Sequence, residues 1–129
     1  MARYRQALPN LGESLFITDG GLETALVFNE GMDLPEFAAF VLLESQRGRE
    51  LLTNYFRHYL EIAAANRLGI ILETPTWRAS HDWGAKTGHS PEVLEQINLD
   101  AVQLLAGLRS AHETQDTTVV ISGCIGPRG

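Results

Sequence analysis

The amino-acid sequence predicts an α/β fold built on a parallel β-sheet. Three short apolar runs, at 15–18, 69–74 and 118–122, alternate with longer stretches of helical periodicity. The order strand, helices, strand, helix, strand is typical of a parallel sheet, because the crossover between neighbouring parallel strands needs a helix. We therefore expect three parallel strands, with the two long helices on one side and all carboxyl ends at one edge.

The first strand, at 15–18, ends in an unusual turn. Asp19, Gly20 and Gly21 follow it directly, and this is a turn signal that the interior of a strand would not contain. An acid on such a turn lies at the carboxyl end of a strand, where α/β proteins place their binding and catalytic residues. Asp19 is therefore the first candidate site residue.

Two helices are expected between the first and second strands. Asp33 and Pro35 are typical of an N-cap and an early helical proline, so they predict a short helix over 36–44. Gly48 is expected to interrupt the chain before a longer helix over 49–67. This helix has one apolar stripe with three- and four-residue steps, formed by Leu52, Tyr55, Phe56, Tyr59, Ile62 and Ala63.

The second strand is predicted at 69–74, where a continuous apolar run indicates a strand covered on both faces. Gly69 is expected to end the preceding helix. A polar loop is then expected from Pro75 to His89.

The next helix is expected to start at Ser90 and Pro91, which are a cap and a first-turn proline. Its apolar stripe consists of Val93, Leu94, Ile97, Ala101, Leu104 and Leu105. The β-branched run at 118–122 predicts the third strand.

Each predicted strand is followed by a segment rich in glycine, proline or polar residues. These segments are 19–21, 73–76 and 123–127. Because parallel strands point their carboxyl ends the same way, the three segments are expected to converge in space, although they lie about fifty residues apart in sequence.

Composition excludes several classes of protein. The chain has 129 residues, a formal net charge of −6 and a pI near 5.1, and its basic residues are scattered. This argues against binding to nucleic acid or to an anionic membrane surface. The longest apolar run, at 37–43, is too short to cross a bilayer, and the opening residues do not have the pattern of a signal peptide. We therefore expect a cytoplasmic protein with one domain over 1–129.

Several candidate residues also have structural interpretations. Asp19 could brace its turn by accepting backbone N–H bonds, and Glu73 could be neutralised by a neighbouring base. Cys124 has no nearby His or Cys partner in the sequence, which favours a small buried residue over a metal ligand or nucleophile. No dinucleotide or P-loop signature is present, so nucleotide binding is not expected.

The motifs together resemble the homocysteine S-methyltransferase family. The resemblance is carried by "TDGGLETAL" followed by the glycine of "FNEG", by "ETPTWRAS" after the second strand, by "INLDAV" in the next helix, and by "ISGCIGPRG" after the third strand. Four motifs in the right order and spacing cover the chain from about residue 15 to 129.

This resemblance implies a (β/α)8 TIM barrel, of which about three βα units lie in this chain; such barrels typically need about 250 residues. In the family, zinc held by three cysteine thiolates binds the sulfur of homocysteine. The methyl donor is S-methylmethionine, betaine or a methylated folate, depending on the branch. The zinc cysteines belong to later strands and Cys124 matches none of them. The expectation is therefore a partial domain, 1–129, that lacks the zinc-binding half.

The resemblance also implies roles for single residues. Asp19 is expected to hold the ammonium group of the amino acid, and Gly20 and Gly21 let the backbone approach it. Further substrate-binding candidates are Thr74, Thr76 and Gly123. Glu23 stands where many members of the family have a small residue. No catalytic residue and no metal ligand is expected in this segment.

Two other functions remain open from the residues alone. Asp19 and Glu73 could form the acid–base pair of a small αβ hydrolase or lyase. Alternatively, the chain could be a non-catalytic remnant that binds an amino acid, or a partner chain through its sheet edge. The oligomeric state and the methyl donor are not determined by the sequence.

Overall fold

The computed structural model describes residues 3–4 and 6–128 and contains a three-stranded parallel sheet. Its strands are β1 (Phe16–Thr18), β2 (Gly69–Glu73) and β3 (Val119–Ser122), in the order β1-β2-β3. Ile17, Ile70 and Val119 lie side by side across the sheet. The predicted α/β class, the parallel pairing and the strand positions are confirmed.

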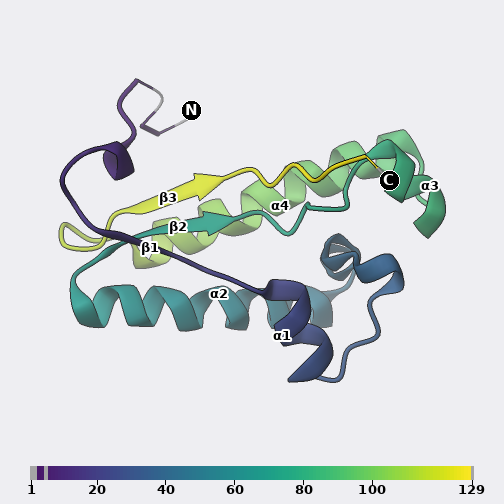
Figure 1. The fold of residues 1–129 in the computed structure, drawn as a ribbon, viewed down its shortest axis with the longest axis horizontal. Helices are drawn as coiled ribbons and strands as arrows, with labels where there is room; N and C mark the ends of the chain where they lie inside the picture. Colours follow the sequence, from purple (N-terminus) through teal and green to yellow (C-terminus); the bar gives the residue numbers. More distant parts are fainter. Residues whose placement is uncertain (1–2, 5, 129) are drawn as a thin grey trace.

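The two long helices, α2 (Gln46–Asn66) and α4 (Pro91–His112), lie on the same side of the sheet (Figure 1). They contact each other, α2 contacts β2, and α4 contacts β3. The core forms where their apolar stripes meet the sheet, and its fully or almost fully buried side chains include Leu52, Phe56, Leu60, Ile70, Leu72, Ala101, Leu105 and Val119. The predicted burial is wrong for two members of these stripes, because the side chains of Ile62 and Val93 are 46% and 42% exposed.

Helix α2 begins earlier than predicted, and Gly48 does not interrupt it. Ser45 is the N-cap, and its hydroxyl oxygen accepts a hydrogen bond from the N–H of Gly48 at 3.0 Å. A Cβ atom at position 48 would lie 2.1 Å from the carbonyl oxygen of Leu42. Glycine is therefore needed here for a close approach between two backbone segments.

Gly69 does not end α2 as predicted. Arg67 takes the left-handed conformation at the C-cap, with φ of 54°, and Gly69 is the first residue of β2. A Cβ atom at position 69 would lie 2.3 Å from the ring of Phe16, so the glycine allows β1 and β2 to pair closely.

The short α-helix predicted over 36–44 is replaced by two 3₁₀ segments, η2 (Pro35–Phe37) and η3 (Ala39–Glu44). Glu36 and Phe37 have φ values of 53° and 59°, which an α-helix does not allow. Leu34, not Asp33, occupies the N-cap position, and it makes no side-chain capping bond. A further 3₁₀ segment, η1 (Pro9–Leu11), precedes β1.

Two short helices lie where none was predicted. Helix α1 (Leu22–Phe28) follows the Gly-Gly turn, and α3 (His81–Thr87) lies inside the predicted polar loop at 75–89. Both lie beyond the carboxyl ends of the strands (Figure 1). They therefore border the same edge of the sheet as the candidate site residues.

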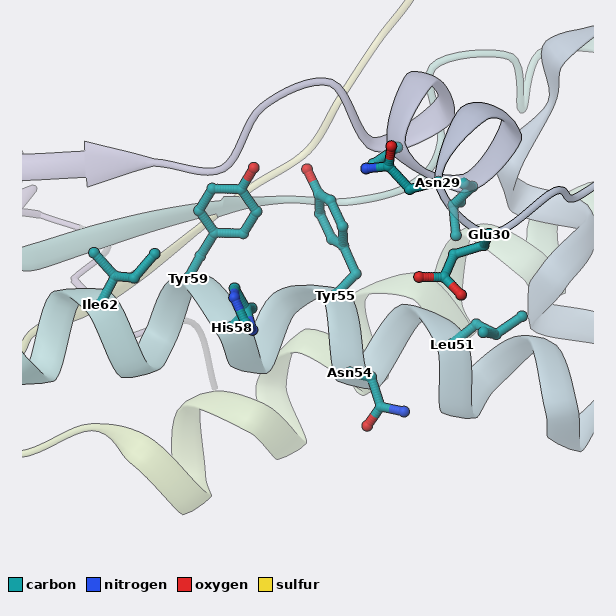
Figure 2. A pocket seen from close by; sticks show the side chains of 10 residues that line it. Asn29, Glu30, Leu51, Asn54, Tyr55, His58, Tyr59 and Ile62 are labelled. Atoms are coloured by element: carbon teal, nitrogen blue, oxygen red, sulfur yellow. The ribbon is translucent and has the colours of Figure 1, made fainter.

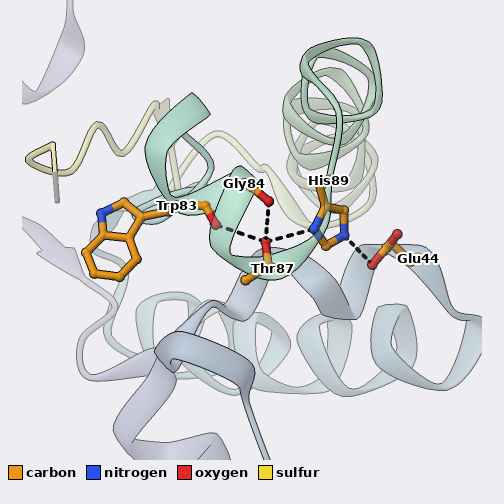
Figure 3. Close-up of polar contacts among 5 residues, drawn as sticks. All are labelled: Glu44, Trp83, Gly84, Thr87 and His89. Atoms are coloured by element: carbon orange, nitrogen blue, oxygen red, sulfur yellow. Dashed lines mark hydrogen bonds and ion pairs between the residues drawn. The ribbon is translucent and has the colours of Figure 1, made fainter.

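Polar contacts fix the end of α3 (Figure 3). The hydroxyl of Thr87 lies 3.0 Å from the carbonyl oxygen of Trp83 and 2.8 Å from His89 Nδ1. His89 Nε2 lies 3.0 Å from a carboxylate oxygen of Glu44, at the end of η3. These contacts join α3 to the segment before α2.

Every helix in the described part of the chain is too short or too polar to span a lipid bilayer.

Candidate functional site

A cavity of about 210 Å³ lies at the carboxyl ends of the strands. Its walls come from the turn after β1, the start of α1, the loop after β2 and the loop after β3. The lining residues are Asp19, Gly20, Gly21, Leu22, Glu23, Glu73, Thr74, Pro75, Trp77 and Cys124. The predicted convergence of the three loops is therefore observed, and we take this cavity as the candidate site.

Asp19 is held in place by two neighbouring elements. One carboxylate oxygen accepts a hydrogen bond from the backbone N–H of Glu73 at 3.1 Å, which joins the ends of β1 and β2. The other oxygen lies 3.4 Å from the hydroxyl of Tyr55 on α2. The structural interpretation of Asp19 is thus partly correct, since the side chain braces the edge of the sheet.

The electrostatic environment of Asp19 is unfavourable for a carboxylate. Burial raises the pKa of Asp19 above its ordinary value, and the nearby charge of Glu73 adds to this rise, while the hydrogen bonds oppose it. Asp19 forms no ion pair with any residue that the structure describes. A partly buried carboxylate without a cation, in a cavity, is suited to bind a positively charged ligand group.

The two glycines of the turn differ in their roles. Gly21 has a positive φ of 65°, which a residue with a side chain rarely adopts. The carbonyl oxygen of Gly20 accepts hydrogen bonds from the hydroxyls of Tyr55 at 2.8 Å and Tyr59 at 3.1 Å. Helix α2 therefore fixes the turn through two tyrosines, for which the apolar periodicity of the sequence predicts only core packing.

Thr74 and Thr76 form a closed ring of hydrogen bonds with the backbone of Cys124. The N–H of Cys124 donates to Thr74 Oγ1 at 2.9 Å, and the hydroxyl of Thr76 donates to the carbonyl oxygen of Cys124 at 2.8 Å. The two threonine oxygens are 2.7 Å apart. Because Thr76 uses its only hydroxyl hydrogen on Cys124, Thr74 is the donor within this pair.

The ring leaves the two hydroxyls with little contact to solvent, since Thr74 is 3% and Thr76 is 7% exposed. Its effect is to hold the loop after β3 against the loop after β2. Thr74 lines the cavity, whereas Thr76 does not.

The remaining acidic candidates and Gly123 occupy different positions. Glu23 lines the cavity from the first turn of α1, and burial raises its pKa, with a further rise from the charge of Asp19. The side chain of Glu73 is exposed, although its backbone holds Asp19. Gly123 is exposed and does not line the cavity, and a Cβ atom there would meet nothing within 4 Å.

A larger cavity, of about 500 Å³, lies between α1 and α2 (Figure 2). The rings of Tyr55 and Tyr59 stand on one wall, with their hydroxyls directed to the segment after β1. Other lining residues are Ala25, Leu26, Asn29, Glu30, Leu51, Asn54, His58 and Ile62. We prefer the smaller cavity because all three strand ends meet there, as ligand sites in parallel α/β sheets do.

The chain's residues do not fit a zinc site made of thiolates. Cys124 is the one cysteine of the sequence, and burial raises the pKa of its thiol, with smaller contributions from nearby carboxylates. A site with three thiolate ligands needs three cysteines, and the sequence has one. Among the described residues, no group of three His, Cys, Asp or Glu side chains is arranged to hold a metal ion.

Fold and site together define an α/β protein with a small-ligand cavity at the carboxyl ends of its parallel strands. The homocysteine S-methyltransferase family model matches residues 16–129, and the chain belongs to that family. The family is one of methyltransferases, in agreement with the resemblance seen in the sequence. No curated protein and no solved structure matches the chain.

Proposed function

We propose that this chain contributes the amino-acid-binding part of a homocysteine S-methyltransferase, with Asp19 as the residue that binds the substrate ammonium group. The proposal is carried by one observation. Asp19 is a fixed, partly buried carboxylate without an ion-pair partner among the described residues, and it lines the cavity where three parallel strands end. The family match over residues 16–129 supplies the class of reaction.

The proposed reaction moves a methyl group from a donor to the sulfur of homocysteine and gives methionine. The homocysteine thiol loses its proton, a sulfur–carbon bond forms, and the donor's bond to the methyl group breaks, with the electron pair staying on the donor. Donors of the S-methylmethionine, betaine or methylfolate type remain open. The sulfur is activated by zinc in this family, and we assign that role to no residue of this chain, because its residues do not fit such a site.

The other predicted site residues receive positioning roles in this proposal. Gly20 and Gly21 keep side chains away from the substrate next to Asp19. Thr74 and Thr76 hold the loop after β3 in place through Cys124. Gly123 starts that loop. We propose that the sheet forms the first three strands of a (β/α)8 barrel, since its parallel order and outer helices agree with that architecture.

The test is the variant Asp19→Asn, which removes the charge and keeps the shape. The amide oxygen can still accept the Glu73 N–H bond, and the amide nitrogen can donate to the hydroxyl oxygen of Tyr55. A charge-assisted hydrogen bond contributes about 1.5–3 kcal/mol, so we expect homocysteine affinity to fall about ten- to hundredfold in calorimetric titrations.

A ligand control shows whether the loss comes from the ammonium group. 4-Mercaptobutanoate has the thiol and carboxylate of homocysteine but no amine. Its affinity should not fall in Asp19→Asn, because it has no ammonium group for Asp19 to hold. Equal homocysteine affinity in the two proteins would remove Asp19 from the site.

A further inference from the structure

Arg78, in the loop after β2, is a cation whose protein neighbours are aromatic. Its guanidinium carbon lies over two indole rings, 4.3 Å from the ring centroid of Trp77 and 3.5 Å from that of Trp83. It forms no ion pair with any residue in the described part of the chain. Its Nε atom is buried and has no hydrogen-bond partner there.

This arrangement differs from that of Arg128, in the loop after β3, which makes two hydrogen bonds to Asp82, at 2.7 and 3.1 Å. The guanidinium of Arg78 is instead stacked on aromatic rings, and its N–H groups donate to no acceptor among the residues that the structure describes. A group of this kind is complementary to a carboxylate, which can accept two parallel N–H bonds.

Arg78 also lies at the border of the candidate site. Trp77, on which it stacks, lines the cavity together with Asp19 and Glu23. Its charge is close enough to Glu23 to oppose the rise in the pKa of that carboxyl. The border of the cavity thus has a positive group at the Trp77 side and negative groups at the α1 side.

We propose that Arg78 binds the carboxylate of the methyl donor and thereby determines which donors the enzyme accepts. This inference rests on the proposed methyltransferase function. Homocysteine carries its ammonium and carboxylate on the same carbon, so a molecule held at Asp19 has its carboxylate next to Asp19. Arg78 does not line the cavity that Asp19 lines, and it is therefore assigned to the second substrate.

The charge distribution selects a donor that is itself zwitterionic. S-methylmethionine and betaine both combine a carboxylate with a positively charged sulfonium or ammonium centre. With the carboxylate on Arg78, the positive centre lies towards the carboxylate of Glu23, while Asp19 holds the ammonium group of homocysteine. The site therefore distinguishes zwitterionic donors from purely cationic molecules of the same shape.

The experiment compares donors with partners that lack the carboxylate. Betaine is paired with choline, and S-methylmethionine with its carboxamide, and each is titrated calorimetrically into the protein in the presence of homocysteine. We expect Arg78→Gln to weaken the carboxylate-bearing donor about tenfold and to leave its carboxylate-free partner unchanged. Arg78→Lys keeps the charge without the planar fork and should lose part of the affinity.

Lys86→Gln is the matched control. Lys86 also lies over the ring of Trp83, at 3.9 Å, and its substitution removes the same charge from the same cluster. It should leave donor affinity unchanged. Circular dichroism and tryptophan fluorescence of each variant establish that it is folded.

Three results would overturn the assignment of Arg78. They are equal losses for a donor and its carboxylate-free partner, no loss for either, and no binding of betaine or S-methylmethionine by a protein that binds homocysteine. A failure of the proposed function gives a different result. In that case homocysteine does not bind, but the protein still prefers carboxylate-bearing ligands and loses this preference in Arg78→Gln.

Discussion

Thr76 uses its hydroxyl hydrogen on the backbone of Cys124, and this makes it the residue on which the buried ring depends. In Thr76→Val the shape is kept, but the carbonyl of Cys124 and the hydroxyl of Thr74 lose their partners. A buried polar group without a partner costs about 1–3 kcal/mol, so the free energy of unfolding should fall by about that amount in urea denaturation.

Two further variants test whether the ring is one unit. Thr76→Ser retains the hydroxyl and should lose much less stability than Thr76→Val. The double variant Thr74→Val/Thr76→Val should be clearly less destabilised than the sum of the single valine variants, because each single change already disrupts the ring. Additive losses would show that the three hydrogen bonds act independently.

The ionised carboxylate of Asp19 is expected to lower the free energy of unfolding, although it is the group that binds the substrate. Because the folded protein raises the pKa of Asp19, the free energy of unfolding falls as the pH rises from the ordinary value near 3.8 through the raised value. Asp19→Asn should therefore have a higher Tm than the wild type at neutral pH, and the difference should disappear below about pH 3.8. Thermal unfolding across this pH range, without ligand, measures it. A lower Tm of the Asn variant at neutral pH would mean that bracing is the main role of this carboxylate.

At the level of single elements, two glycines in long helices have opposite surroundings. Gly48 in α2 contacts the backbone of Leu42, whereas a Cβ atom at Gly107 in α4 would meet nothing within 4 Å. Alanine is about 1 kcal/mol more favourable than glycine in a helix interior. Gly107→Ala should raise the free energy of unfolding by about this amount, and Gly48→Ala should lower it, because backbone cannot move aside cheaply. Equal effects of the two substitutions on urea denaturation would contradict the close contact at Gly48.

The long elements were predictable from sequence because their patterns are unambiguous. The run at 69–74 is continuously apolar, and α4 has both a cap at Ser90 and a proline at Pro91. The seven-residue helices α1 and α3 were not predicted, since a helix of two turns shows too little periodicity. The 3₁₀ path at 35–44 depends on positive φ at Glu36 and Phe37, which those residue types do not signal.

On the scale of the whole molecule, the parallel sheet explains which parts of the site the sequence could predict. Asp19, Gly20, Gly21 and Thr74 line one cavity because they all follow strand ends. Glu23 lines it only because α1 turns back over the sheet edge, and Tyr55 reaches Asp19 only because α2 packs beneath it. These contributions depend on how the helices pack against the sheet, which local sequence patterns do not predict.

The hydrogen bond between Asp19 and Glu73 has a consequence for the order of folding events. It closes a loop of 54 residues, and the bond between Thr74 and Cys124 closes one of 50 residues. Contacts between such distant residues form slowly, after local helices, because the chain must first lose the entropy of the intervening loop. Refolding from urea should therefore restore helical circular dichroism before it restores the capacity to bind homocysteine. The cavity thus reports the last step of assembly, when all three strands have paired.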